Sequence, residues 1–599
     1  MPSAGQPVNE QYTELLSVGP FGGLDTTTEP FFVAPSNFVS GSNFVPNAGY
    51  GGFVTAKGRL PFLAAPLQGR CWGMHRIRQA GQPDMWLFAV EYGTVMLFYS
   101  AVQGGVATII NTTPHWQQNT QVVFADSLHW VFISNGVNTP VKYDILTGLM
   151  TNWGMASPTT APLLAFGPAS TMNGTYHYTI TFGNAVQESS QGVVSLPITV
   201  SNTGVLLTSI PTASDSQVTE RNIYRIGGSL GQWRLVGTIN DNSTTTYSDT
   251  LGDDQITGQL LTVFRDPPAP FTSIVAHKER IWGFGTPSDP SIVYYSNYGE
   301  PWGFNNLTGN FPVGENSFGD GSVGMASIGT QLVLFKNRTI YNITGSNDAD
   351  FQVNKLFDIG CKSAKSICTA YGVCWWISRQ GMYQYDGSSP QNISDGNFQA
   401  SNIKTILDGF SSSTDLIDCT SFVYDRMVHF CFPTVNQTFL FDLRAQGWYP
   451  LNWAADQVDF DIESDIPIIG TNLQTVGQID QWFAAPGDFG GTIDSFLISR
   501  ITDSGNIHAT KEYRYLELQA PVQNGQVVAT VIIDPGTLQI TDTQAFDLSS
   551  GFTRQQLSLK KGMSGAEVQI KLLIRAAATI HIQKAAVFGY EKALFRGAA

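Results

Sequence analysis

The feature that most constrains this chain is a succession of short apolar runs with almost no helical periodicity. Residues 86–90 and 95–99 predict a β-hairpin, and similar runs follow at 122–124, 128–133 and 141–143. Each run is β-branched or aromatic and is bounded by Gly, Asn, Asp or Pro, which is typical of strands. The 60 glycines and 30 prolines favour many turns. We therefore expect an all-β fold.

Two internal repeats indicate which kind of all-β fold to expect. The segment 130–136 is similar to 375–381, and in both cases a second apolar run that ends in Asp follows. A hairpin ending in Asp, a turn, Gly and Trp also occurs twice, with Asp144, Gly148 and Trp153 in one copy and Asp442, Gly447 and Trp448 in the other. We expect the Asp to bond turn amides, the Gly to adopt a positive φ and the Trp to pack on an adjacent sheet. Repeated hairpins of this kind predict a β-propeller, which leaves few sheet edges exposed.

A different pattern interrupts the repeats. In residues 174–182, small or polar residues alternate strictly with aromatic or aliphatic ones. Short predicted strands recur after this segment at intervals typical of a sandwich. We interpret 157–263 as an inserted fibronectin-III-like sandwich. Five more strands are predicted at 512–519, 526–533, 554–559, 567–574 and 579–588. The expected domains are an N-terminal arm at 1–60, the propeller at 61–156 and 264–500, the inserted sandwich at 157–263 and a C-terminal β-sandwich at 501–599.

Charged residues are sparse and mostly acidic. They make up only 13% of the chain, and the net charge is −15. From residue 510 onward there are 10 basic and 7 acidic residues, a net of +3, so residues 1–509 hold 22 basic and 40 acidic residues, a net of −18. Proteins that grip nucleic acid depend on Lys and Arg to neutralise phosphates. The negative net charge excludes tight DNA binding as the main role, but it allows DNA to pass along the protein without being bound.

The sequence lacks the common motifs of catalysis and cofactor binding. It has no Gly-Lys dipeptide for a phosphate-binding loop and no zinc-protease helix motif. Residues 319–324 fit the dinucleotide fingerprint in form, but they lie among turn residues without a crossover helix. No two of the six cysteines have CxxC spacing, so we expect buried reduced thiols. We expect no catalytic residues, no cofactor and no metal site.

An acidic stretch near the end of the expected propeller is the main candidate site. Its members are Asp456, Asp459, Asp461, Glu463 and Asp465. In one extended strand the last four would share a face, because side chains alternate along a strand. Such a face could be a solvated edge strand protected by charge, the negative lining of a channel, or a calcium loop. The spacing lacks the Gly and terminal Glu of a calcium loop, which favours the first two interpretations.

A set of short motifs gives the chain a resemblance to a known family. The motifs lie at 21–25, 176–178, 188–189, 223–225, 276–282, 293–296, 301–302, 332–336, 339–341, 359–361 and 381–387. On these residues the chain resembles the tail nozzle proteins of short-tailed bacteriophages, also called tail tubular protein B. The resemblance covers roughly residues 20–450 and rests on scaffold residues, not on catalytic ones.

The resemblance implies a homohexameric ring at the distal end of a short tail. The ring would dock on a tail adaptor ring, carry fibres or spikes, and enclose a channel through which double-stranded DNA passes transiently without specific binding. Phe21, Gly22, Gly23 and Leu24 would form a docking arm. The protein would be part of the virion tail, assembled in the host bacterial cytoplasm. We expect no membrane span, because no run approaches the ~20 apolar residues that one requires.

Two other functions stay open at this point. A propeller glycan depolymerase needs two carboxylates a few ångströms apart, and the 47 acidic residues allow such a pair by chance. A carbohydrate-binding host-recognition protein would use Trp and Tyr rings as platforms for sugars. We expect a structural virion protein and not an enzyme, because the strand pattern, the missing catalytic motifs and the sign of the charge agree with a conduit.

Overall fold

The computed structural model describes residues 12–19, 22–47, 52–78, 81–261, 264–314, 320–395, 402–410, 413–459, 467–473, 476–485, 488–489, 491–506, 508–536 and 539–592. Nearly all regular structure in them is β-strand, which confirms an all-β fold. The helical elements are single short turns: α1 (Lys404–Gly409), α2 (Ser413–Ile417), η1 (Asp253–Gln255), η2 (Ala364–Ser366) and η3 (Pro433–Val435).

The chain divides into two compact units. Unit 1 comprises Met1–Val90, Ala101–Ala107 and Cys361–Ala599, and unit 2 comprises Glu91–Ser100 and Thr108–Gly360. One antiparallel sheet has the order β10-β9-β8-β7. Its strands are β7 (Cys71–Ile77), β8 (Met85–Tyr92), β9 (Val95–Val102) and β10 (Thr108–Gln117). Strands β8 and β9 confirm the predicted hairpin.

Unit 2 contains three small antiparallel sheets in which strands adjacent in sequence pair. The first consists of β11 (Val123–Ser127), β12 (Trp130–Ser134), β13 (Val141–Asp144) and β14 (Met150–Asn152). The second consists of β20 (Ser273–His277), β21 (Arg280–Phe284), β22 (Ile292–Asn297), β23 (Glu300–Phe304) and β24 (Asn310–Pro312). The third consists of β25 (Ser322–Ile328), β26 (Gln331–Lys336), β27 (Ile340–Thr344) and β28 (Gln352–Phe357). Their first strands touch in sequence, because β11 contacts β20 and β20 contacts β25.

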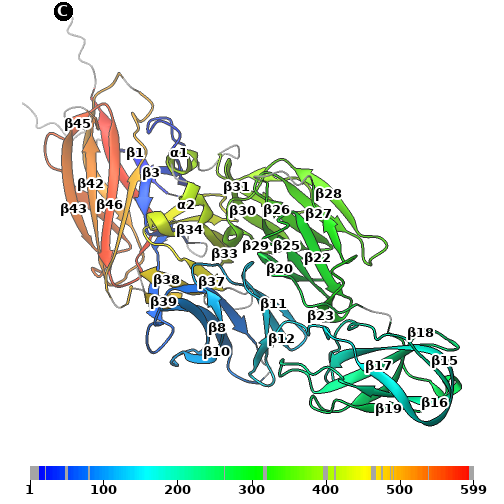
Figure 1. Cartoon of the computed structure of the whole chain (residues 1–599). Coiled ribbons are helices and arrows are strands. Elements are labelled where there is room, and N and C mark those ends of the chain that lie inside the picture. Colours follow the sequence, from blue (N-terminus) through cyan, green and yellow to red (C-terminus); the bar gives the residue numbers. More distant parts are fainter. Residues whose placement is uncertain are drawn as a thin grey trace, which may run out of the picture. The chain divides into compact units, whose positions relative to one another are not determined.

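The segment expected to be inserted forms a five-stranded sheet of unit 2, ordered β18-β17-β15-β16-β19 (Figure 1). Its strands are β15 (Leu163–Gly183), β16 (Ile198–Thr208), β17 (Glu220–Gly227), β18 (Leu230–Ile239) and β19 (Tyr247–Asp249). The long strand β15 pairs with β16 along its first part and with β17 along its second. The apolar members of the predicted alternation in β15, Tyr176, Tyr178 and Ile180, all lie in the core of this sheet. The expected outward face is only partly exposed, because Thr179 and Thr181 are buried as well.

Unit 1 contains three further four-stranded sheets. They consist of β29 (Cys368–Ala370), β30 (Val373–Ser378), β31 (Gly381–Tyr385) and β32 (Gln391–Asn392); of β33 (Thr420–Tyr424), β34 (Met427–Phe432), β35 (Gln437–Asp442) and β36 (Trp448–Leu451); and of β37 (Gln457–Asp459), β38 (Ile468–Leu473), β39 (Val476–Ala485) and β6 (Gly58–Pro61). Contacts join β29 to β33, β33 to β37 and β37 to β7. The N-terminal strand β6 thus completes a sheet whose other strands come from much later in the chain.

The remaining sheets of unit 1 join the two ends of the sequence. One has the order β1-β48-β41-β44 with β45 beside β41, one has the order β2-β3-β40-β46-β42-β43, and one has the order β4-β5-β47. The N-terminal strands are β1 (Thr13–Val18), β2 (Gly23–Leu24), β3 (Asn37–Ser42), β4 (Phe44–Pro46) and β5 (Phe53–Thr55). The C-terminal strands are β40 (Ile493–Ser499), β41 (Lys511–Gln519), β42 (Gln526–Ile533), β43 (Ile540–Asp547), β44 (Arg554–Ser558), β45 (Ser564–Gly565), β46 (Val568–Ala576), β47 (His581–Ile582) and β48 (Lys584–Glu591). Residues of the two larger sheets share one hydrophobic cluster.

The internal repeats correspond to equivalent strands of different sheets. The two similar segments lie in β12 and β30, each the second strand of a four-stranded sheet. The predicted turn bonds are confirmed. Asp144 Oδ1 accepts from the Leu146 amide at 2.8 Å, and Asp442 Oδ1 accepts from the Arg444 amide at 2.7 Å.

The two tryptophans of these hairpins also behave as predicted. Trp153 Nε1 donates to the carbonyl of Pro301, in β23 of the next sheet, at 2.9 Å. Trp448 Nε1 donates to the carbonyl of Ile393, which follows β32 in the preceding sheet, also at 2.9 Å. Each indole therefore fastens its hairpin to an adjacent sheet while remaining almost fully buried.

The predicted role of the glycine holds in only one of the two hairpins. Gly148 has a φ of +71°, as expected. In the second hairpin the positive φ falls on Gln446 (+52°), so the expectation for Gly447 was wrong. Gly447 is needed for space instead, because a Cβ there would lie 2.1 Å from the carbonyl oxygen of Gly22.

Candidate functional site

The acidic stretch is only partly described by the structure. Asp461, Glu463 and Asp465 lie outside the described residues. Asp459 ends β37 and is paired with Ile468 of β38. Asp456 precedes β37, and its carbonyl accepts hydrogen bonds from Lys365 Nζ at 3.3 Å and Thr420 Oγ1 at 2.9 Å. A channel lining by this stretch stays a prediction.

Positive charges accompany Asp456. Burial lowers the pKa of Lys365, the carboxylates of Asp418 and Asp456 raise it, and the Arg70 guanidinium lowers it further. These effects place two cations and two carboxylates within electrostatic reach of one another in unit 1. The surroundings of Asp456 therefore include cations as well as carboxylates.

The expected docking arm is partly described as well. Phe21 lies outside the described residues, and Gly23 and Leu24 form β2, which pairs in parallel with β3. The Leu24 side chain is buried, and Gly22 approaches Gly447 closely. These residues therefore make contacts within unit 1, and docking on another protein through them stays a prediction.

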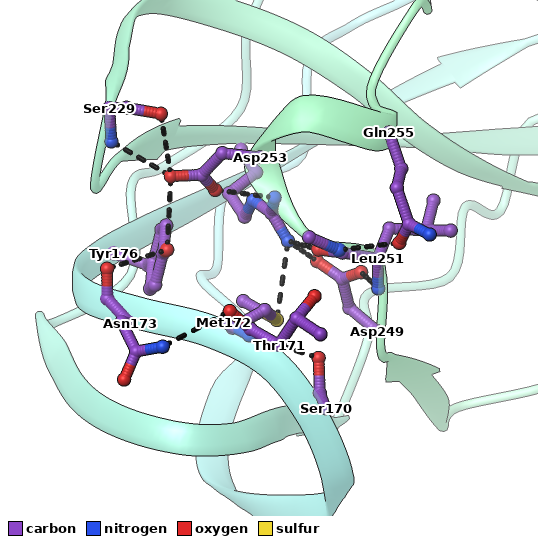
Figure 2. Close-up of polar contacts among 12 residues, drawn as sticks. Ser170, Thr171, Met172, Asn173, Tyr176, Ser229, Asp249, Leu251, Asp253 and Gln255 are labelled. Carbon is purple, nitrogen blue, oxygen red and sulfur yellow. Dashed lines mark hydrogen bonds and ion pairs between the residues drawn. The ribbon is translucent and has the colours of Figure 1, made fainter.

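A buried ionic cluster in the β15–β19 sheet combines residue types that occur in active sites (Figure 2). Arg225 of β17 reaches two carboxylates, with Nη1 2.6 Å from Asp249 Oδ2 and Nη2 2.9 Å from Asp253 Oδ1. The Tyr178 hydroxyl donates to Asp249 Oδ2 at 2.8 Å. Asp253 Oδ2 also accepts from the amide and the hydroxyl of Ser229, at 2.8 Å and 3.0 Å, as Figure 2 shows.

The charges of this cluster are fixed in place. Burial opposes the charge on Arg225, but Asp249 and Tyr178 together raise the pKa of Arg225 above its usual value. Burial, with the charge of Asp249, raises the pKa of Tyr178 far above its usual value. An arginine that stays charged and a tyrosine that stays neutral do not exchange protons near neutral pH. The cluster therefore serves to hold the Asp253 turn against β17.

Sequence reasoning did not find this cluster. Arg225 lies in the motif 223–225 of the family resemblance, where no charged partner was predicted for it. A signal was present, because Arg225 lies between Tyr224 and Ile226, and an arginine that is buried among such residues must find a partner. The partner itself could not be chosen, since the sequence does not fix which carboxylate β17 faces.

Two polar contacts join the inserted segment to neighbouring sheets of unit 2. Arg265 binds Glu300 of β23 through two parallel hydrogen bonds of 2.8 Å and 2.9 Å, and its Nη1 lies 3.6 Å from Glu188. Lys142 of β13 donates from Nζ to Gln187 Oε1 at 2.8 Å. Both cations bridge a strand of a small sheet and the segment that carries β15–β19, so they set the orientation of that segment within the unit.

A third group surrounds the N-terminal strand β6. Arg59 Nη2 lies 2.8 Å from Asp488, and its guanidinium covers the rings of Trp453 and Phe489 at 4.9 Å and 5.0 Å from their centroids. Its Nη1 is 4.0 Å from the fully buried Asp480. Burial raises the pKa of Asp480 to about 6, and Arg59 opposes that rise. This group fastens β6 to β39.

The cysteine thiols and the imidazole of His429 are held in unreactive states. All six cysteines are free and five are buried. Burial raises the pKa of Cys71, Cys361 and Cys368 to about 12, so their thiolates are scarce near neutral pH. Burial also lowers the pKa of His429 to about 3. Among the described residues, no three His, Cys, Asp or Glu side chains are grouped so as to hold a metal ion.

Comparison with known proteins adds little to these findings. No protein-family model matches the chain, and no curated protein matches it. Among solved structures, the computationally designed Ika8 protein is similar over 70% of this chain and 99% of its own, with 10% identity and a TM-score of 0.33. Sqt1 of Saccharomyces cerevisiae is similar over 71% and 99%, with 6% identity and a TM-score of 0.32. TM-scores this low establish neither a common fold nor a common function.

One further structural observation concerns membranes. Across the part of the chain that the structure describes, no helix has the length and apolar character needed to cross a bilayer.

Proposed function

We propose that this chain is the structural subunit of a hexameric tail nozzle, through which double-stranded DNA leaves a short-tailed phage and to which fibres or spikes attach. The observation that carries the proposal is the negative charge balance. Residues 1–509 have a net charge of −18. Duplex DNA carries one negative charge per roughly 1.7 Å of its axis, so a wall of like charge lets it pass.

Many lysine and arginine side chains already pair with carboxylates of the same chain, which supports the proposal of a wall that does not retain DNA. At least fifteen of the 32 lysines and arginines form ion pairs with carboxylates among the described residues. The basic region after residue 510 is included, since Arg554 pairs with Glu517 and Arg575 with Asp494, both at 2.7 Å. Cations that are already paired contribute less to binding phosphates.

We infer that seven sheets are the blades of a propeller, with the sheet β15–β19 as a sandwich inserted between two blades and the terminal sheets as a second sandwich. In the described residues, and apart from the sheet β15–β19, seven antiparallel sheets of four or five strands follow one another along the chain from β7 to β39. The contacts between their first strands, within each unit, agree with a radial arrangement. Strand β6 supports closure, because it covers the edge of the last sheet with a strand from the N-terminus.

The copy number in phage particles tests this function. Quantitative mass spectrometry of purified virions, with the major capsid protein as the internal standard, should find six copies of the chain per particle. Absence of the chain from virions would remove the proposal.

A binding experiment tests the channel wall. Fluorescence anisotropy with a labelled duplex should give no saturable binding at physiological salt, whereas tight binding would contradict a non-retaining wall. Parallel assays for glycan turnover and glycan binding separate the nozzle from a depolymerase and from a host-recognition protein. Turnover abolished by a single Asp or Glu substitution would favour the depolymerase.

A further inference from the structure

Lys142 is a buried cation whose direct partners are two carboxamides. Its side chain is 3% exposed, and Nζ lies 5.8 Å from the centroid of the Trp130 ring. Nζ donates to Gln187 Oε1 at 2.8 Å and to Gln217 Oε1 at 2.5 Å. Among the described residues, no carboxylate oxygen lies within 4.0 Å of Nζ. The amine is thus held against amide carbonyls in a place that excludes water.

This environment favours the uncharged amine. Burial lowers the pKa of Lys142 to about 7, although Asp215 and Asp144 oppose the change. A large share of the Lys142 side chains is therefore neutral at neutral pH, and a neutral amine with a free electron pair is a nucleophile. A lysine with its usual pKa would be almost entirely protonated and unreactive under the same conditions.

Gln217 differs from Gln187 in the surroundings of its amide nitrogen. Gln217 Nε2 donates to Asp215 Oδ2 at 3.2 Å and to the carbonyl of Asn152 at 3.0 Å. These two acceptors fix the plane of the carboxamide while its oxygen receives Lys142 Nζ. A carboxylate beside the leaving nitrogen of an amide stabilises the positive charge that this nitrogen gains when it is protonated.

We propose that Lys142 and Gln217 join in an intramolecular isopeptide bond that ties β13 covalently to the inserted segment. The Lys142 Nζ electron pair attacks Gln217 Cδ, and the π electrons of the carbonyl move to Oε1. The proton that Nζ loses moves to Nε2, and Asp215 Oδ2, which lies 3.2 Å from Nε2, stabilises the positive charge that Nε2 gains. The carbonyl re-forms as the Cδ–Nε2 bond breaks, and Nε2 departs as ammonia. One N–C bond forms, one breaks, and no oxidant or other reactant is needed.

The bond would stabilise the fold partly by restricting the conformations of the unfolded chain. Lys142 and Gln217 are 75 residues apart in sequence, and a covalent link across such a loop restricts the unfolded ensemble much as a disulfide does. Gln187 would hold the amine in position and Trp130 would keep water away from it. The inserted segment would then keep its attachment to the β11–β14 sheet even where the hydrogen bonds open.

Mass spectrometry of the purified full-length chain tests this directly. The sequence has no Lys or Arg from 79 to 221 except Lys142 and Arg221, so trypsin should release 79–142 and 143–221 if Lys142 is free. A cross-linked Lys142 resists trypsin, and the expected product is a single 79–221 peptide lighter by one ammonia. Fragment ions should place the linkage between Lys142 and Gln217.

Variants assign the roles. Lys142→Arg and Gln217→Ala should each have the mass calculated from their own sequence, with no loss of ammonia. Asp215→Asn should slow the loss of ammonia in freshly purified protein. Gln232→Ala, at an exposed position of β18, is the matched control and should still form the bond. Recovery of the two separate peptides at full mass from the wild-type chain, after prolonged incubation at pH 8, would overturn the proposal.

Discussion

Arg225 Nη1 and Asp249 Oδ2 lie 2.6 Å apart, and neither side chain has any surface exposed to solvent. Two opposite charges in such a place stabilise one another only as a pair, since either one alone would be a buried uncompensated charge. The pair therefore ties β17 to the end of β19, although these two strands are not neighbours in the five-stranded sheet of unit 2.

Arg225→Met should destabilise this sheet by about 3–5 kcal/mol, because it leaves the Asp249 carboxylate buried without its partner. Chemical denaturation of the full chain measures the loss, and hydrogen exchange of the β15–β19 amides localises it.

The double variant Arg225→Met/Asp249→Leu should recover part of the loss, because it removes both charges. Arg575→Ala is the control, since Arg575 is 70% exposed and its pair with Asp494 is worth at most about 1 kcal/mol. Equal destabilisation by Arg225→Met and Arg575→Ala would show that burial does not matter at this pair.

Asp480→Asn should stabilise the chain at alkaline pH. Burial raises the pKa of Asp480 from its usual 3.8 to about 6, so the folded state favours the protonated carboxyl. The stability that protonation contributes is complete below pH 3.8 and is lost as the pH rises through about 6. The Tm of Asp480→Asn should therefore exceed that of the wild type at pH 8, and the difference should shrink toward pH 4.

Asp494→Asn is the matched control for this substitution. The Arg575 guanidinium lowers the pKa of Asp494, so its removal should bring no gain at pH 8. A Tm difference for Asp480→Asn that is the same at every pH would contradict the titration.

His429→Phe should make the chain less sensitive to acid. Burial lowers the pKa of His429 from 6.5 to about 3, so the folded state favours the neutral ring, and stability is lost as the pH falls from 6.5 toward 3. A phenyl ring cannot titrate and can still stack on Phe422, whose ring centroid is 4.4 Å away. The ratio of stability at pH 4 to that at pH 7 should rise in the variant; parallel acid profiles would refute this.

Gly447→Ala should destabilise unit 1 by about 1–3 kcal/mol, because the new methyl group would overlap the carbonyl oxygen of Gly22. Gly409→Ala is the matched control, since no atom lies within 4 Å of a Cβ at that position. The control should stay within about 0.5 kcal/mol of the wild type. Thermal melting of both variants decides the matter, and identical Tm values would argue against the close approach.

Local features of the fold were predictable from the sequence. The hairpin of β8 and β9, the strand β42 and the turn bonds of Asp144 and Asp442 follow from periodicity and turn chemistry, which act over a few residues. The repeat also placed β12 and β30 in equivalent positions.

Long-range pairing could not be predicted in the same way. Alternation says which face of a strand is buried but not which strand lies beside it, so the pairing of β1 with β48 and of β6 with β39 left no local signal. For the same reason, the cluster of Arg225 and the contacts of Lys142 could not be predicted. Arg225 is 24 residues from Asp249 in sequence, and Lys142 is 75 residues from Gln217. For the acidic stretch, the spacing of Asp456 and Asp459 could be seen in the sequence. The contact of Lys365 with Asp456 could not, because these two residues are far apart in the chain.

The central claim is that six copies of this chain surround a channel whose wall does not retain DNA. Electron cryomicroscopy of the phage particle that carries the chain tests it most directly. The account predicts a six-fold ring of this chain at the distal end of the tail, with a lumen in which acidic side chains outnumber free Lys and Arg. A single copy on the particle, or a lumen lined by unpaired Lys and Arg in contact with phosphates, would contradict it.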